Sequence, residues 1–351
     1  MSHPAFVFCI LVTEAMSFRV LAFSAVLCCV LARRVPRPQL DEHWEIYKGV
    51  HSKEYVPGEE HDRRLIWEDN LDFIRRHNLE YDLGLRTHTV AVNSFADLTS
   101  EEYRQLYLGY RPSERKKTAL GVHNEASLHD IPDEIDWRDY HYVTHVKDQG
   151  KCGSGWAFSA SGALEGRHFG DTGNLIRLSE QNLVDCDNTS SGCEGGSMVN
   201  AFEYVFYNGG IDTELSYPYT ARKGSCKFSK SNVGAVDRGY MGIDQSEDAL
   251  KSAVAIHGPI AAAIDASHRS FRFYSGGVYN EPHCSSHKLD HGILVIGYGT
   301  GGDGDYWLVK NSYGIGWGEN GYIRMSRNKD NQCGIASDAS YVIGISSNID
   351  W

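Results

Sequence analysis

The stretch QGKCGSGWAFS, residues 149–159, opens the part of the chain that most constrains its fold. From Gly155 onward, apolar and small residues fall on one helical stripe, at Trp156, Ala160, Ala163 and Leu164. This spacing predicts a helix over residues 155–169 that turns one face to a core. A Ser-Glu-Gln-Asn start at Ser179 and a helical pattern over residues 197–207 predict two further helices.

Downstream of Gly258 the pattern changes from helix to strand. Apolar alternation is found over four runs, residues 260–264, 292–298, 306–310 and 322–326. The glycine-rich residues 301–304 between two of these runs predict a hairpin turn. Helices followed by strands favour an α+β domain with two lobes, one helical and one an antiparallel, barrel-like sheet.

The chain upstream of residue 131 has a different character. Residues 41–80 read as helical, and the periodicity over residues 61–81 predicts an amphipathic helix. Thr99 with two following glutamates predicts another helix start. Residues 111–130 lose apolar periodicity and predict an exposed linker. We therefore expect a small helical unit over residues 33–130 and a larger mixed domain over residues 131–351.

The amino terminus has the features of a targeting segment. Arg19 precedes the apolar run 20–31, which ends in the small-residue pattern Val-Leu-Ala. These features predict a cleaved signal peptide over residues 1–32 and entry into the secretory pathway, with Met1 or Met16 as the start. The apolar run is about 12 residues long, too short for a stable membrane span.

Cysteine usage agrees with a secreted chain. Three of the nine cysteines lie in residues 1–32, and the other six are Cys152, Cys186, Cys193, Cys226, Cys284 and Cys333. An even set in a secreted protein predicts three disulfides, although six cysteines allow 15 pairings.

Composition and charge exclude several classes of protein. Hydrophobic residues make up 41% of the chain and charged residues 23%, which are ordinary values for a globular protein. Residues 33–130 carry 15 Lys/Arg against 18 Asp/Glu, a net charge of −3, and residues 131–351 carry 18 against 27, a net charge of −9. An acidic domain repels nucleic acid, so we expect no such partner. The spacing of ligand-type residues predicts no metal site and no cofactor.

The opening stretch resembles the signature around the nucleophile of papain and cathepsin L. In those enzymes the residue just before the tryptophan is the reactive cysteine, whereas this chain has Gly155. Cys152 matches the structural cysteine of that family. Gln149 matches its side-chain oxyanion donor.

Two later segments carry the same resemblance to cathepsin L-like peptidases of the papain family. The segment LDHGIL, residues 289–294, resembles the one that presents the catalytic imidazole, which makes His291 the base. The segment YWLVKNSYG, residues 306–314, resembles the one that carries the orienting amide, Asn311. Trp317 would shield the bond between them from water.

The resemblance extends over about residues 41–345 and includes the pro-segment. Residues that match the helix motif of cathepsin L-like propeptides are Glu59, Arg63, Trp67, Asn70, Ile74 and Asn78. Asn93, Phe95 and Asp97 match the second propeptide motif, with Ala91 where glycine is usual. The resemblance implies a papain-like two-lobe fold preceded by a helical inhibitory propeptide that lies in the substrate cleft.

The resemblance also implies cleft residues and a cysteine pairing. The implied pairs are Cys152–Cys193, Cys186–Cys226 and Cys284–Cys333. Residues implied to bind substrate are Gly195, Gly196, Met198, Ala263, Leu289, Asp338 and Trp317. Asp338 departs from the uncharged residue usual in this pocket, and its carboxylate either favours basic side chains or points to solvent. Asn188 begins a glycosylation sequon.

Gly155 leaves three interpretations open. Without a thiolate, the remaining groups of a catalytic triad accelerate the reaction roughly 10³–10⁴-fold over the uncatalysed reaction in water. Complete enzymes reach about 10⁶–10¹⁷-fold. The chain is then an inactive homologue that keeps a cleft for peptides, protein ligands or cystatin-like inhibitors besides its own propeptide. Alternatively, Gly155 is a mutation or sequence error in an active lysosomal or digestive endopeptidase, or the fold has a structural or storage role. We expect a monomer, extracellular or lysosomal.

Overall fold

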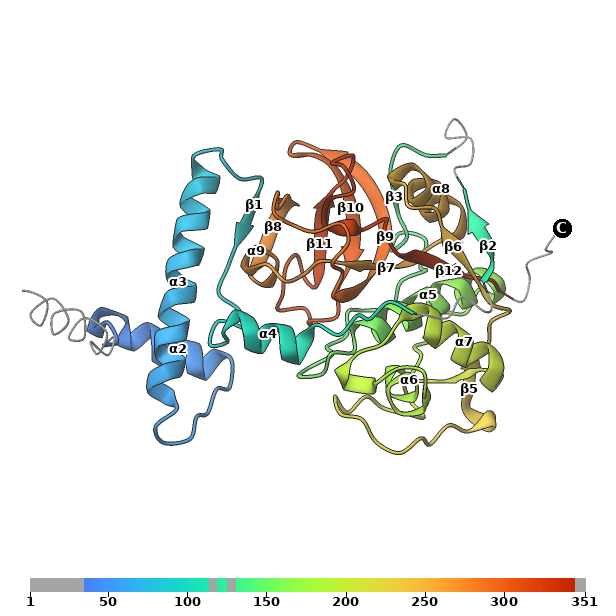
Figure 1. Cartoon of the computed structure of the whole chain (residues 1–351), viewed down its shortest axis with the longest axis horizontal. Coiled ribbons are helices and arrows are strands. Elements are labelled where there is room, and N and C mark those ends of the chain that lie inside the picture. Colours follow the sequence, from blue (N-terminus) through green and yellow to red (C-terminus); the bar gives the residue numbers. More distant parts are fainter. Residues whose placement is uncertain (1–34, 114–118, 125–130, 345–351) are drawn as a thin grey trace, which may run out of the picture. The chain divides into compact units, whose positions relative to one another are not determined.

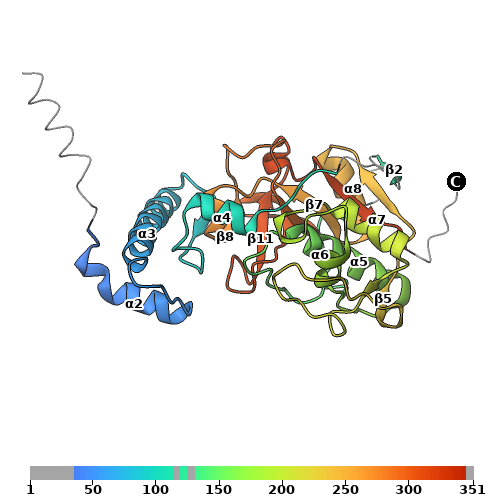
Figure 2. The ribbon, with the colours of Figure 1, turned by 60° about the horizontal axis from the view of Figure 1, so that its bottom comes forward.

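The computed structural model describes residues 35–113, 119–124 and 131–344. The predicted signal peptide over residues 1–32 lies outside the described residues. The chain divides into two compact units, Met1–Leu65 and Ile66–Trp351. Figures 1 and 2 show its helices and strands, which are α2 (Asp41–Val50), α3 (Glu60–Asp82), β1 (His88–Val90), α4 (Ser100–Tyr107), β2 (Ala119–His123), β3 (Ile135–Asp136), α5 (Gly155–Thr172), α6 (Glu180–Cys186), α7 (Met198–Asn208), β4 (Ile211–Asp212), β5 (Val233–Ala235), β6 (Tyr240–Ile243), α8 (Glu247–His257), β7 (Ile260–Ile264), α9 (Arg269–Arg272), β8 (Tyr274–Tyr279), β9 (His291–Gly301), β10 (Gly304–Lys310), β11 (Tyr322–Ser326) and β12 (Ala339–Val342).

In the first unit, aromatic and charged side chains tie α2 to the start of α3. The ring of Trp44 stacks on that of Tyr55 with centroids 5.6 Å apart, and its Nε1 donates to Glu60 Oε1 at 3.0 Å. Arg64 donates to Asp41 Oδ1 at 3.1 Å. The helices predicted over residues 41–80 are thus confirmed as α2 and α3.

In the second unit, α5 forms the centre of the core. The residues of its predicted stripe are at most 2% exposed, namely Trp156, Ala160, Ala163 and Leu164. The helix contacts strands β7 and β9 as well as helices α6 and α7, so it joins the helical lobe to the sheet. The predicted start at Ser179 is confirmed, because its hydroxyl accepts the N–H of Asn182 at 2.9 Å and caps α6.

The sheet of the second unit is mostly antiparallel. Its strands lie in the order β1-β8-β11-β10-β9-β7-β12-β6-β2, and β3 pairs with β9. Only two neighbouring pairs along this path are parallel, β8 with β11 and β2 with β6. Gly301 pairs with Gly304 across the predicted hairpin turn between β9 and β10. The α+β class with a helical lobe and a sheet lobe is therefore confirmed.

The pro-segment is hydrogen-bonded to the rest of the second unit through its motif residues. Asn70 donates to the carbonyl of Ala96 at 2.8 Å, and its Oδ1 accepts from Arg272 at 2.8 Å. Asn93 donates to the carbonyl of Arg272 at 2.8 Å. These contacts explain why the compact unit begins at Ile66, well before residue 131.

The pro-segment supplies both edge strands of the sheet, β1 beside β8 and β2 beside β6 (Figure 1). The expectation of an exposed linker is therefore wrong in one respect at residues 119–123, since they form β2, although Leu120 and Val122 are exposed as expected. The pairing with β6 overrides the weak local pattern of that segment. No helix within the described ranges is long and apolar enough to cross a membrane.

Candidate active site

Three structural elements bring the predicted catalytic residues together. His291 is the first residue of β9, and Asn311 directly follows β10, which pairs with β9. Gly155 is the first residue of α5 and faces the His291 ring. Gly155 and His291, which are 136 positions apart in the chain, thus meet at the first residues of α5 and β9.

The imidazole of His291 is oriented by the side chain of Asn311. Nε2 of His291 lies 2.8 Å from Asn311 Oδ1, and the same oxygen accepts the backbone N–H of Ser312 at 2.8 Å. The backbone donor identifies this atom as the carbonyl oxygen, which only accepts. The proton of the neutral imidazole therefore lies on Nε2, and Nδ1 carries the lone pair.

Burial keeps this imidazole neutral. It lowers the pKa of His291 to about 4, although the hydrogen bond with Asn311 acts in the opposite direction. Nδ1 has no hydrogen-bond partner among the described residues. The ring of Tyr313 stacks on the imidazole at 5.0 Å and 29°, and that of Phe271 lies 6.2 Å away at 70°. The ring is thus held by packing as well as by Asn311.

The ring edge of His291 fills the space that a side chain at residue 155 would need. A Cβ added to Gly155 would lie 2.6 Å from Cε1 and 2.7 Å from Nδ1 of His291, and 3.0 Å from the oxygen of Gly292. Ordinary contacts between such atoms are about 3.5 Å or longer. Any side chain at this position therefore requires the imidazole to withdraw.

The predicted oxyanion donor binds a carbonyl of the pro-segment. Nε2 of Gln149 donates to the carbonyl of Tyr107 at 2.9 Å and to that of Cys152 at 2.7 Å. Its Oε1 accepts the hydroxyl proton of Ser312 at 2.6 Å, which fixes the orientation of the amide. The donor thus already holds a peptide carbonyl.

After α4, the pro-segment crosses the site as an extended strand. The carbonyl of Gly109 accepts the N–H of Gly196 at 2.9 Å, and Arg111 donates its N–H to the carbonyl of Gly196 at 2.9 Å. Tyr110 pairs with Gly196 in the parallel sense. A Cβ on Gly195 would lie 2.4 Å from the carbonyl oxygen of Gly109, so this close approach requires glycine at residue 195. Gly195 and Gly196, which were predicted to bind substrate and are called the glycine edge below, thus lie beside the extended backbone of the pro-segment.

The side chain of Tyr110 occupies the predicted side-chain pocket. It is 5% exposed and packs in one hydrophobic cluster with Met198, Ala263 and Leu289. Its hydroxyl donates to the carboxylate of Asp338. The carboxylate of Asp338 therefore faces the occupant of the pocket.

Trp317 is buried beside the aromatic residues of the site. Its Nε1 donates to the carbonyl of Arg272 at 3.1 Å, and its ring lies 5.6 Å from that of Tyr313 and 5.1 Å from that of Phe271. It thus packs against both rings that flank His291. Tyr313 and Tyr107 were missed by the sequence reasoning, although Tyr313 lies inside the segment quoted for Asn311.

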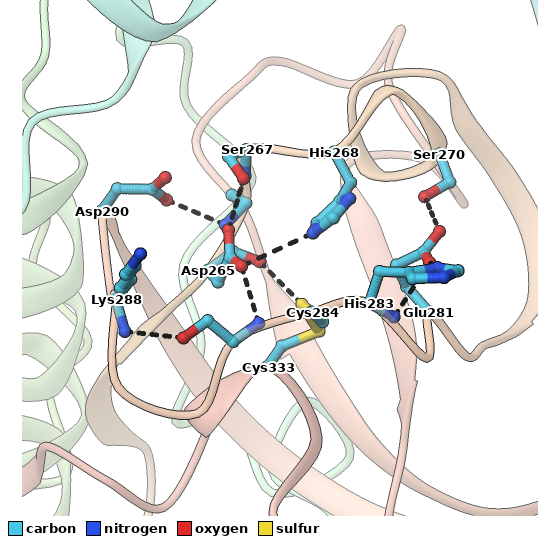
Figure 3. A network of polar contacts seen from close by, with 12 residues as sticks. Asp265, Ser267, His268, Ser270, Glu281, His283, Cys284, Lys288, Asp290 and Cys333 are labelled. Atoms are coloured by element: carbon cyan, nitrogen blue, oxygen red, sulfur yellow. Dashed lines mark hydrogen bonds and ion pairs between the residues drawn. A yellow bond between two sulfur atoms is a disulfide. The ribbon is translucent and has the colours of Figure 1, made fainter.

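A polar network borders the strand that begins at His291 (Figure 3). Burial raises the pKa of Asp290 to about 7, and its carboxylate accepts the N–H of Ala266 at 2.8 Å. Burial also tends to raise the pKa of Asp265, but hydrogen bonds from His268 and Ser267 outweigh it and bring the pKa to about 2. The residue next to His291 therefore changes charge near neutral pH.

One group within this network has the composition of a metal site. Ligand-type atoms of Asp265, His268 and Cys284 lie within 4.8 Å of one another. The sulfur of Cys284 is bonded to Cys333 and offers no thiolate. The group is therefore a poor metal site.

The structure contains the three disulfides Cys152–Cys193, Cys186–Cys226 and Cys284–Cys333, the pairing that the resemblance implies. The first joins the loop before α5 to the loop that ends at the glycine edge. It thus fixes two walls of the cleft relative to each other. Asn188 is exposed between α6 and α7, and its glycosylation stays a prediction.

Two family matches cover most of the chain. Residues 131–343 match the papain family cysteine protease, and residues 44–103 match the cathepsin propeptide inhibitor domain (I29). The chain therefore belongs to the papain family of cysteine proteases.

Within that family the chain is a cathepsin L-like pro-form. Procathepsin L of Rattus norvegicus is 49% identical over 327 residues, which cover 91% of this chain and 97% of the relative. A cathepsin L-like peptidase of Aedes aegypti is 51% identical over 312 residues, 86% of this chain and 92% of the relative. The solved digestive procathepsin L2 proteinase from Tenebrio molitor larval midgut has a TM-score of 0.82 and 41% identity, and covers 87% of this chain and 99% of its own.

Proposed function

We propose that this chain is a cathepsin L-like proprotein that binds peptides in its cleft and does not hydrolyse them. Gly155 carries the proposal, because peptide hydrolysis in this family needs a thiolate and glycine has no sulfur. Nδ1 of His291, the acceptor for a thiol proton, faces Gly155 and has no thiol to deprotonate.

The contacts of the pro-segment support a cleft that binds extended peptides. Gln149 and Gly196 contact backbone atoms, which every peptide offers, and neither contact involves residue 155. In the pocket, the carboxylate of Asp338 accepts a hydroxyl proton from Tyr110. A carboxylate there favours ligands with a basic or hydroxyl-bearing side chain.

The proposal includes partners and a location. The pro-form is made with a signal peptide over residues 1–32, and its pro-segment ends near residue 131, where the peptidase-like domain begins. It acts as a monomer in the extracellular space or the lysosome. Cystatin-like inhibitors are ligands of the same cleft. Another protease removes the pro-segment, since His291 has no nucleophile to activate.

The test compares the chain as written with Gly155→Cys and Gly155→Ala. After acid incubation, Gly155→Cys should cleave a fluorogenic peptide at least about 10³-fold faster than the chain as written, and a thiol-alkylating reagent should abolish the cleavage. Gly155→Ala adds only a Cβ, so it controls for the displacement of His291 and should stay inactive. The proposal is wrong if the chain with Gly155 cleaves the peptide and a thiol-alkylating reagent abolishes that cleavage.

A second candidate is an active cysteine endopeptidase whose gene encodes cysteine at residue 155. The identity of about half with a relative named digestive cysteine proteinase favours it. Sequencing the gene from fresh material decides between the two candidates. A structural or storage role is the outcome if the chain, once its pro-segment is removed by an active protease, binds neither peptides nor a cystatin-like inhibitor.

A further inference from the structure

A second groove lies outside the peptide cleft. It measures about 770 Å³, and its walls come from the end of α6, the carboxyl-terminal half of α7 and the segment from Cys226 to Phe228. Helices α6 and α7 are labelled in Figure 2. The disulfide Cys186–Cys226 joins two of these walls. A volume of this size is typical of sites that bind small organic ligands, which measure about 300–1,000 Å³.

Aromatic side chains line this groove, which we call the aromatic groove. Tyr207 is 71% exposed, and Tyr204 and Phe228 are half-buried. The hydroxyl of Tyr204 accepts a hydrogen bond from Asn182 at 2.9 Å, and the ring of Tyr207 meets that of Phe206 edge to face at 5.2 Å and 80°. Aromatic rings with a polar tip suit a ligand that has both apolar faces and hydroxyl groups.

Two carboxylates of the groove wall lack hydrogen-bond donors. Asp187 is 1% exposed and Glu203 is 7% exposed, and both line the aromatic groove. Oδ2 of Asp187 and Oε1 of Glu203 have no hydrogen-bond partner in the part of the chain that the structure describes. Buried acceptors are normally satisfied, so these two favour a ligand that brings donors. A sugar combines hydroxyl donors with an apolar face that packs on aromatic rings.

The chain has an attachment point for sugar at the rim of this groove. Asn188 is exposed, lines the aromatic groove and begins the only Asn-X-Ser/Thr triplet in the sequence, residues 188–190. Oδ1 of Asp187 accepts the backbone N–H of Thr189 at 2.8 Å and its hydroxyl proton at 2.6 Å. This turn fixes the backbone from which the side chain of Asn188 projects.

Asn188 also borders another groove, on the side of the cleft. That groove measures about 370 Å³, and the described residues that line it, Arg111 and Gly196 among them, include no aromatic side chain. In the proprotein the backbone of Arg111 already binds Gly196 there, at 2.9 Å. The aromatic groove is therefore the side of Asn188 that offers both space and stacking surfaces.

We propose that Asn188 carries an N-linked oligosaccharide whose first sugars lie in the aromatic groove and leave the peptide cleft open. The inference rests on entry into the secretory pathway, which is part of the proposed function. It does not depend on which residue is at position 155.

The modification needs one co-reactant, a lipid-linked oligosaccharide diphosphate of the secretory pathway. The side-chain nitrogen of Asn188 forms a bond to the anomeric carbon of the first sugar, and the bond from that carbon to the diphosphate oxygen breaks. The nitrogen loses one proton, and the lipid diphosphate leaves with the electron pair of the broken bond. No oxidation or reduction is involved.

The test uses the full-length chain secreted from eukaryotic cells, with a signal peptide of proven function in place of residues 1–32. Mass spectrometry of the peptide that contains Asn188 should show an attached oligosaccharide, and Ser190→Ala should abolish it. The hydroxyl of Ser190 has no hydrogen-bond partner among the described residues, so this variant loses no bond of the fold. Enzymatic removal of the glycan from the native chain gives a second glycan-free form if Ser190→Ala does not fold.

Tyrosine nitration reports where the sugars lie. Tyr207 should react about three- to tenfold more slowly in the glycosylated chain than in a glycan-free form, the factor that corresponds to a contact as strong as an aromatic pair. Tyr140 is the matched control, because it is 58% exposed and likewise packs against a ring, that of Trp137 at 5.5 Å. The nitration rate of Tyr140 and the amide exchange of residues 109–111 should be the same in all forms.

A second variant and three outcomes keep the test decisive. Tyr207→Ala should speed the enzymatic release of the glycan from the native chain by a similar factor, since the sugars lose their stacking surface, whereas Tyr140→Ala should not. A secreted chain with unmodified Asn188 overturns the proposal. Equal nitration of Tyr207 in all forms, or slower amide exchange at residues 109–111 in the glycosylated chain, also overturns it. Failure of residues 1–32 themselves to direct secretion, measured separately with the natural amino terminus, counts against the proposed function alone.

Discussion

A single amide oxygen determines the chemical form of the imidazole at the site. Oδ1 of Asn311 accepts from both His291 Nε2 and the backbone of Ser312, so it can neither rotate away nor act as a donor. The lone pair on Nδ1 is thereby directed toward residue 155. The geometry of this imidazole is thus set by its own neighbours and not by a thiol.

Replacing Asn311 with alanine should release the imidazole from this tautomer. Asn311→Ala leaves the N–H groups of His291 and Ser312 without their acceptor, and buried groups in this state cost about 1–3 kcal/mol of folding free energy. Nitrogen-15 NMR should show the Nε2–H tautomer losing its dominance, and urea unfolding should show the loss of stability. Asn174→Ala, at an exposed residue, should change the stability by less than about 0.5 kcal/mol. A variant that still shows only Nε2–H contradicts this account.

At this scale, the sequence singles out the residues of the candidate site but not the contacts that they make. Gln149, His291 and Asn311 lie in dense motifs, so they could be singled out by resemblance to the family. The approach of the His291 ring to Gly155 depends on a missing Cβ, and the bond from Gln149 to Tyr107 depends on how the pro-segment lies in the cleft. Both are consequences of packing between distant parts of the chain.

Among the elements, α5 and α6 are joined by a buried ionic cluster. Nζ of Lys147 donates to Glu165 Oε1 of α5 at 2.9 Å and to Glu180 Oε1 of α6 at 2.6 Å. Burial opposes the charge on Lys147 and on Glu165. The attraction outweighs it, so the pKa of Lys147 is raised and that of Glu165 is lowered. One lysine therefore holds two helices of the core together.

Lys147→Met should destabilise the protein in a pH-dependent way. Removing one partner of a buried ion pair costs about 3–5 kcal/mol. Loss of the lysine removes the largest of the interactions that lower the pKa of Glu165 against the effect of burial. The pKa of Glu165 in the folded protein therefore rises, and the loss of stability should grow as the pH rises from 4 to 7.5. Urea unfolding at both pH values measures it. Lys151→Met, at an exposed lysine, is the matched control, and an equal loss at both pH values refutes the prediction.

Elements with strong local signals could be predicted, and edge elements could not. The stripe of α5 and the cap of α6 are local patterns, and both are confirmed. β2 is five residues long and forms only because β6, more than a hundred residues downstream, offers its edge. Parallel pairing of this kind leaves no turn signal between the partners.

For the whole molecule, the pro-segment is part of the fold and not an appendage. It contributes both edge strands of the sheet and the occupant of the cleft. Gly109 is central to the cleft contact, because a Cβ there would lie 2.0 Å from the carbonyl oxygen of Gly153. The atoms that this Cβ would meet all belong to the backbone of Gly153, so they leave little room for adjustment.

Gly109→Ala should therefore loosen the pro-segment in the cleft. Overpacking of this kind costs about 1–3 kcal/mol, and the amide protection of residues 107–111 should fall by about tenfold or more. Gly49→Ala is the matched control, because no atom lies within 4 Å of the added Cβ in helix α2. The control should keep the cleft protected and should gain up to about 1 kcal/mol in helix stability. Unchanged protection in Gly109→Ala would show that the cleft contact tolerates a side chain.

The position of β1 and β2 at the two ends of the sheet has a consequence for self-association. A strand without a neighbour exposes a row of N–H and C=O groups that can pair with another molecule. With β1 and β2 in place, β8 and β6 are interior strands, and the proprotein presents only two short pro-segment strands at these ends. Removal of the pro-segment uncovers two such rows at once. A molecule without its pro-segment would therefore have an open cleft and two unpaired strand edges, and it should be more prone to aggregate than the proprotein.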